Sequence, residues 1–139
     1  MSLYKNYATD AVKEQSGVAV ETSENKDGTL ATFYISRMGQ GNKRYSKALE
    51  VATRPYRRQL ELGTMNGEIA DRLFRKVFCE TVLLGWANVT NRDEEYIEFS
   101  PEAALALFTD LPDLYTELQE KAKSAALFRE ESTEDETKN

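Results

Sequence analysis

Two stretches near the N-terminus alternate apolar with polar residues, which is the pattern of a strand with one buried face. Their apolar members are Val18, Val20, Phe33 and Ile35. The polar segment between the two stretches ends on Gly28, which tolerates the positive φ that a tight turn needs. The pattern predicts a β-hairpin over about residues 17–36.

Apolar residues then recur every three or four positions from Asn42 to Leu62, which is the spacing of an amphipathic helix. The predicted apolar face consists of Tyr45, Leu49, Ala52, Tyr56 and Leu60. Pro55 has no amide hydrogen to donate and its ring clashes inside a helix, so we expect the helix to kink or to restart after Thr53. Gly63 then supplies a stop.

A further helix is predicted from about Gly67 to Leu84, with Asn66 as its cap. Its apolar residues spread over a wide part of the helix surface. This width indicates a central helix that packs on more than one side. We expect the centre of the protein to contain Leu73, Val77, Val82 and Trp86.

The C-terminal part of the chain predicts two more helices and a tail. Ser100 can cap a helix that begins with a proline. Asp110 can cap the next one, which has Pro112 in its first turn and continues to about Phe128. Residues 130–139 contain five acids and no apolar residue, so we expect a disordered acidic tail.

The predicted fold class is therefore α+β and mostly α, with the hairpin followed by a helical body of about four helices over residues 42–129. The 139 residues, 40% apolar and 30% charged, suit one soluble domain over residues 1–129. No apolar run approaches the ~20 residues of a membrane span. The N-terminal residues show no secretory signal, and the single cysteine suits a reducing cytoplasm.

The candidate chemistry is limited by what the composition lacks. The sequence has no histidine and one cysteine, Cys79. This excludes Ser–His–Asp and Cys–His catalysis, and also metal sites built on imidazoles or on several thiolates. Cys79 lies in an apolar stretch without a neighbour that would lower its pKa, so we expect a buried, inert thiol. We expect a protein without enzymatic activity, cofactor or metal.

The net charge of −6 is unevenly distributed. Residues 37–58 carry seven basic and one acidic side chain, whereas residues 59–139 carry eight basic and eighteen acidic ones. We expect four basic residues to share one exposed face that contacts an acidic protein surface, including that of a neighbouring copy: Arg44, Lys47, Arg54 and Arg58. Membranes and nucleic acid are not expected partners, because the acidic remainder of the chain is repelled by both.

Six large side chains of the two C-terminal helices allow two interpretations. They are Leu107, Phe108, Leu111, Leu114, Tyr115 and Leu118. Most such residues must form the core of a small domain. Two amphipathic helices can also leave a groove for an apolar partner, which makes these residues the candidate client-binding set.

Seven short segments, taken in their order and spacing, resemble the tail assembly chaperones of long-tailed bacteriophages over about residues 1–130. They are Tyr34-Ile-Ser-Arg-Met-Gly, Asn42-Lys-Arg-Tyr, Arg54-Pro-Tyr-Arg-Arg, Gly63-Thr, Gly85-Trp-Ala-Asn-Val, Phe99-Ser-Pro-Glu-Ala-Ala-Leu and Asp110-Leu-Pro-Asp-Leu. The resemblance implies a small helical protein without catalytic residues. It would act in the host cytoplasm, bind the tape measure protein, keep it soluble, and help the major tail tube protein assemble around it.

The resemblance also implies that the protein is absent from the mature virion, and many family members have a longer, frameshifted form. Self-association of copies is a further expected contact. Two other functions remain open from the residues alone. A structural tail or head–tail completion protein would persist in the particle, and a small nucleic-acid-binding regulator would use the basic residues.

Overall fold

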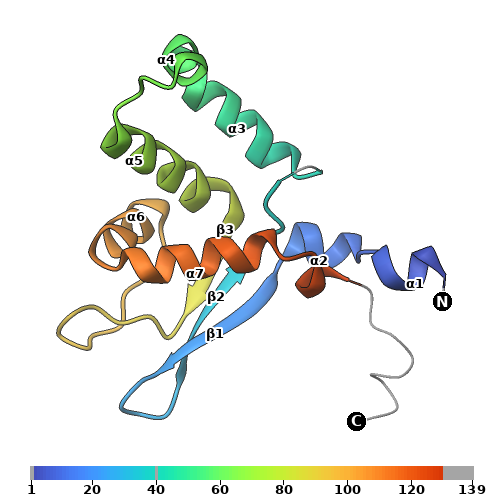
Figure 1. The fold of residues 1–139 in the computed structure, drawn as a ribbon. Helices are drawn as coiled ribbons and strands as arrows, with labels where there is room; N and C mark the ends of the chain where they lie inside the picture. Colours follow the sequence, from blue (N-terminus) through green and yellow to red (C-terminus); the bar gives the residue numbers. More distant parts are fainter. Residues whose placement is uncertain (1, 40, 130–139) are drawn as a thin grey trace.

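The computed structural model of the chain describes residues 2–39 and 41–129. Within this part of the chain, three strands form one antiparallel sheet in the order β1–β2–β3 (Figure 1). The strands are β1 (Val18–Glu24), β2 (Leu30–Ile35) and β3 (Leu83–Ala87). Val18 pairs with Ile35 and Val20 pairs with Phe33, so the predicted hairpin is confirmed.

Helices make up most of the remaining structure, and the predicted α+β, mostly α class is confirmed. Short turns of 3-10 or π-helix are labelled η. In chain order the helical elements are α1 (Leu3–Tyr7), α2 (Ala11–Ser16), α3 (Lys43–Thr53), η1 (Arg54–Tyr56), α4 (Arg57–Leu62), α5 (Gly67–Val77), η2 (Phe78–Val82), α6 (Pro101–Asp110), α7 (Pro112–Lys123) and η3 (Ala125–Phe128).

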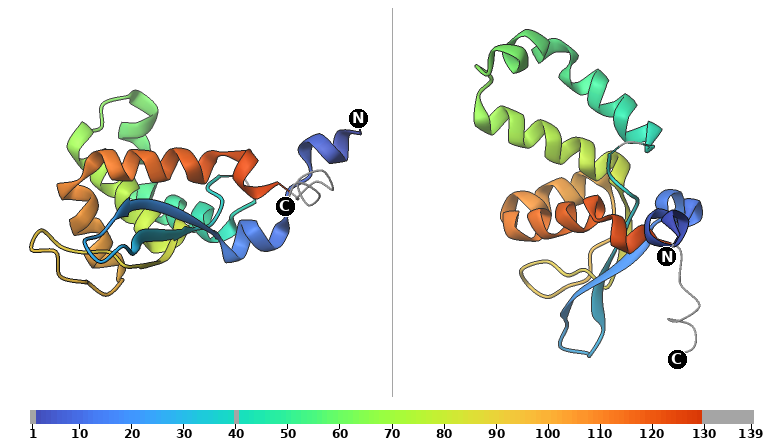
Figure 2. Two further views of the ribbon diagram at one scale, coloured as in Figure 1. Left: turned by 90° about the horizontal axis from the view of Figure 1, so that it is seen from below. Right: turned by 45° about the vertical axis from the view of Figure 1, so that its right-hand side comes forward.

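The core lies between the sheet and the helices α6 and α7, which cover one of its faces (Figures 1 and 2). Phe33 of the central strand contributes the sheet side of this core, and Phe108 of α6 contributes the helix side. Their ring centroids are 6.4 Å apart. Phe78 and Tyr115 complete an aromatic cluster around Phe108, with ring centroids at 6.1 and 5.7 Å. Edge and tilted arrangements of this kind add to the stabilisation from burial.

The helix predicted over residues 67–84 is shorter than expected. The α-helix ends at Val77, η2 follows, and residues 83–87 form β3 against the free edge of β2. An apolar run of this length is compatible with a buried helix or a strand. The unpaired N–H and C=O groups of β2 favour the strand, because they would otherwise lack partners. Val77 and Val82 are buried as expected, whereas Leu73 and Trp86 are only half-buried.

The predicted helix boundaries are mostly confirmed. The α-helix after residue 42 ends at Thr53, immediately before Arg54-Pro55, and restarts in α4. Gly63 ends α4 in the left-handed region, at φ 69° and ψ 22°. Ser100 caps α6 by accepting a hydrogen bond from the amide of Ala103. The cap predicted at Asp110 is wrong, because Asp110 is the last residue of α6 and Leu111 precedes α7 without a side-chain cap.

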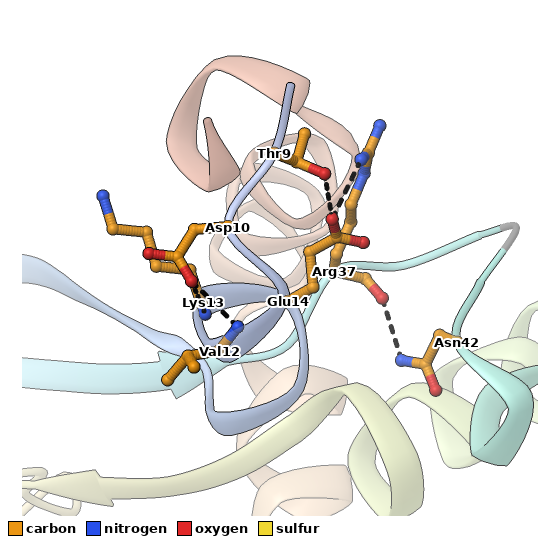
Figure 3. Close-up of polar contacts among 7 residues, drawn as sticks. All are labelled: Thr9, Asp10, Val12, Lys13, Glu14, Arg37 and Asn42. Atoms are coloured by element: carbon orange, nitrogen blue, oxygen red, sulfur yellow. Dashed lines mark hydrogen bonds and ion pairs between the residues drawn. The ribbon is translucent and has the colours of Figure 1, made fainter. Parts of the chain in front are cut away.

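Two helices that the sequence pattern did not predict, α1 and α2, precede the hairpin. Asp10 caps α2 by accepting from the amides of Val12 and Lys13 (Figure 3). The amide of Asp10 donates to the carbonyl of Phe128, whose side chain is buried, so the N-terminal segment is held against η3. Residues 130–139, the predicted disordered tail, lie outside the described residues.

Residues 43–77 form a helical lobe, here called the arm (Figure 1). In chain order the arm is inserted between β2 and β3, which are neighbours in the sheet. Asn42 fixes its root, because its Oδ1 accepts from the amide of Tyr45 and its Nδ2 donates to the carbonyl of Arg37. Arg37 is itself ion-paired with Glu14 of α2, 3.7 Å away (Figure 3). The arm is thereby oriented relative to α2 and the end of β2.

Candidate functional site: a groove on the arm

The arm buries little of its own apolar surface. No residue of α3, η1 or α4 is buried, and Val77 is the buried residue of α5. The expectation of a central helix packed on more than one side therefore holds only for the C-terminal end of the predicted segment. Four large apolar side chains of the arm are exposed, namely Val51, Leu60, Leu62 and Ile69, and Val51 and Ile69 are exposed by 54% and 46%.

The exposed apolar surface of α3 faces that of α5 across an open hollow of about 790 Å³, which we call the arm groove. Side chains from both helices and from η1 form its floor: Val51, Ala52, Tyr56, Ile69, Leu73 and Val77. Large apolar depressions on soluble proteins commonly mark ligand or protein-binding sites. The floor contains no acidic side chain.

Basic side chains surround this apolar floor. They are Arg44 and Lys47 from α3, and Arg72 and Lys76 from α5. The one acidic residue of the lining, Glu80, is ion-paired with Lys76 at 3.9 Å. Arg44 donates from Nη2 to the main-chain carbonyl of Glu80, 3.0 Å away. The rim of the groove is therefore positively charged.

The four residues predicted to form one basic interface are all exposed. Arg44 and Lys47 line the arm groove, whereas Arg54 and Arg58 lie outside its lining. Arg54 is ion-paired with Glu50 of the same helical segment at 3.3 Å. The groove takes two further cations, Arg72 and Lys76, from α5, and a shared contact through the four predicted residues stays a prediction.

The six residues of the candidate client-binding set also divide. Phe108, Tyr115 and Leu118 lie in the core and cannot contact a partner in this conformation. Leu107 and Leu114 are half-buried, and Leu111 is 48% exposed. Leu107 and Leu111 line two hollows of about 420 Å³ each, which makes this corner a smaller candidate surface than the arm groove.

The sequence reading missed the contribution of α5 to the site. The sequence pattern predicts Leu73 at the centre of the protein, and the count of charges along the chain places Arg72 and Lys76 within an acidic segment, whereas all three line the groove. A usable signal was present, because each of the two helices has an apolar stripe bordered by a basic stripe at spacings of three and four. Consecutive helices with matching stripes can combine them into one surface.

Cys79 is fully buried, and this burial raises the pKa of its thiol to about 12. The thiol is therefore protonated near neutral pH and is not a thiolate nucleophile. We expect Cys79 in the folded protein to resist modification by 5,5′-dithiobis(2-nitrobenzoic acid) and to react completely once the protein is unfolded in urea. Rapid modification of the folded protein would contradict the burial of this side chain.

Within residues 2–39 and 41–129, no group of three or more His, Cys, Asp or Glu side chains is arranged to hold a metal ion. A helix that spans a membrane must be both long and strongly apolar. No helix of the same residues meets both requirements.

The fold and the groove define a small α+β protein with a three-stranded sheet and an inserted helical arm that presents an apolar, basic-rimmed groove. Comparison with protein families gives a match to the YdaY prophage protein family over residues 40–139, more than two thirds of the chain. The chain belongs to this family and is phage-derived. The matched residues include the whole arm. No curated protein and no solved structure matches the chain.

Proposed function

We propose that this prophage protein is a tail assembly chaperone that binds the tape measure protein, keeps it soluble and assists assembly of the major tail tube protein around it. The arm groove is the observation that carries this proposal. A protein that holds a long apolar client needs accessible apolar contacts, and the arm leaves such contacts uncovered. It also needs a surface charge that keeps the complex dispersed, which the net charge of −6 supplies.

The proposal needs neither an active site nor a cofactor, and its partners are the two tail proteins. It places the protein in the host cytoplasm and not in the finished particle. The family membership supports a phage origin, and the chaperone role extends beyond it. A structural tail protein, the main alternative, would use the same surfaces but remain in the virion.

Co-expression with the tape measure protein of the same prophage tests the proposal. We expect the soluble fraction of the tape measure protein to rise severalfold when the chaperone is present. Mass spectrometry of purified virions should then detect the tape measure and tube proteins but not this chain. Stoichiometric recovery of the chain in virions would instead establish the structural alternative, and an insoluble client would refute the chaperone role.

A further inference from the structure

We propose that the arm groove binds an amphipathic α-helix whose aliphatic stripe is flanked by Asp and Glu residues. This inference rests on the proposed function for the identity of the client, and on the groove itself for the chemistry. It specifies what kind of segment the chaperone selects. The corner at Leu111 does not identify the kind of partner that would bind there, because the linings of its two hollows include charges of both signs, Arg92, Asp110 and Asp113.

The shape of the groove suits a helix. Its long walls, α3 and α5, have 11 residues each, which corresponds to about 16 Å of helix. A third helix of about three turns lying between them would complete a small three-helix packing. The apolar floor would then receive side chains at positions i, i+3, i+4 and i+7 of the bound helix, which is the usual mode of helix recognition in a groove.

The charge of the arm selects an acidic partner. Residues 43–77 carry nine basic and four acidic side chains, a net charge of +5, within a chain of net charge −6. In the part of the chain that the structure describes, Arg44, Lys47 and Arg72 have no ion-pair partner. Carboxylates on the flanks of a bound helix would lie beside these side chains and fix its orientation.

The same chemistry argues against other occupants. The acidic segment of residues 130–139 has no apolar side chain to fill the floor. Nucleic acid would satisfy the basic rim but would leave Val51 and Ile69 without aliphatic partners. The helix α1 has exposed apolar residues, but its charged side chain is Lys5, of the same sign as the rim.

A fluorescence anisotropy titration with designed peptides tests the inference on the intact protein. The probe is a labelled helix of about 18 residues, long enough to be partly helical alone, with a leucine stripe flanked by glutamates. One matched peptide carries lysine in place of each glutamate, and another carries serine in place of each leucine. We expect the Leu/Glu peptide to bind about tenfold or more tightly than either matched peptide.

Variants at exposed positions locate the binding. Val51→Ser with Ile69→Ser should weaken binding of the Leu/Glu peptide about tenfold, because two apolar contacts are lost. Leu62→Ser is the matched control, since Leu62 is 64% exposed on the arm but outside the groove lining. Lys47→Glu with Arg72→Glu should reverse the preference toward the Leu/Lys peptide, whereas Arg57→Glu with Arg58→Glu should not. Each variant must keep the wild-type circular dichroism spectrum and melting temperature.

Unchanged peptide preference after the Lys47 and Arg72 reversal, or wild-type binding by the Val51 and Ile69 variant, would overturn the inference. A concentration-dependent dimer that the Val51 and Ile69 variant abolishes would show that a second copy occupies the groove. Binding of a labelled DNA duplex, without binding of the Leu/Glu peptide, would assign the groove to nucleic acid. Either result overturns the inference. Peptide binding without solubilisation of the tape measure protein would refute only the proposed function, and solubilisation by the groove variant would refute only the groove assignment.

Discussion

Replacing Phe108 by alanine is expected to lower the free energy of unfolding by about 3–5 kcal/mol, because a fully buried ring is removed and a cavity is left in its place. Phe108 lies among the rings of Phe33, Phe78 and Tyr115, so the cavity would open at the centre of the aromatic cluster. Small domains have a total stability of about 5–15 kcal/mol, so the substitution would remove a large part of the free energy of unfolding.

Urea titration followed by circular dichroism measures this loss. Leu107→Ala is the matched control, because Leu107 precedes Phe108 on the same helix and is only half-buried. We expect about 1 kcal/mol for the control. Equal losses for the two variants would contradict the placement of Phe108 in the core. The result also matters for function, since a Phe108 variant that fails to hold a client would report unfolding and not a missing contact.

Replacing Gly17 by alanine is expected to destabilise the protein by about 3 kcal/mol or more. Gly17 joins α2 to β1 at φ 91° and ψ 167°, a region that is accessible in practice only to glycine. An added Cβ would also lie 2.9 Å from the carbonyl oxygen of Ile35. That oxygen belongs to the backbone of β2 and cannot move away without disturbing the pairing of Val18 with Ile35.

Gly28→Ala is the matched control for a glycine with positive φ but without a close neighbour. Gly28 also has a positive φ, of 87°, but a Cβ there would meet no atom within 4 Å. We expect about 1–2 kcal/mol for this variant, which corresponds to the backbone strain alone. The difference between the two melting or urea midpoints then reports the additional cost at Gly17, which combines its glycine-only backbone conformation with the contact to Ile35. If the Gly17 variant is no less stable than the Gly28 variant, the close approach to Ile35 is wrong.

The predicted basic interface and the predicted client-binding set each differ from the groove that the structure shows, and the physical cause is the same for both. Counting charges along the chain placed Arg72 and Lys76 in an acidic segment, although α5 brings them beside Arg44 and Lys47. A helix pattern likewise shows that Phe108 and Leu111 are apolar, but it does not show which of them faces the sheet. In both cases the deciding information is which element lies alongside, and sequence spacing within one element does not contain it.

The sequence by itself determined the hairpin, the start of α6 and the break of the helix at Thr53, because alternation, caps and proline act over a few neighbouring residues. It also determined the charge pattern and the absence of histidine chemistry. Only the tertiary structure decided that residues 83–87 are a strand, because the free edge of β2 supplies their hydrogen-bond partners. It also decided that the arm, which is inserted in the chain between β2 and β3, keeps its apolar stripes uncovered, because α6 and α7 already cover the face of the sheet that a central helix would have occupied.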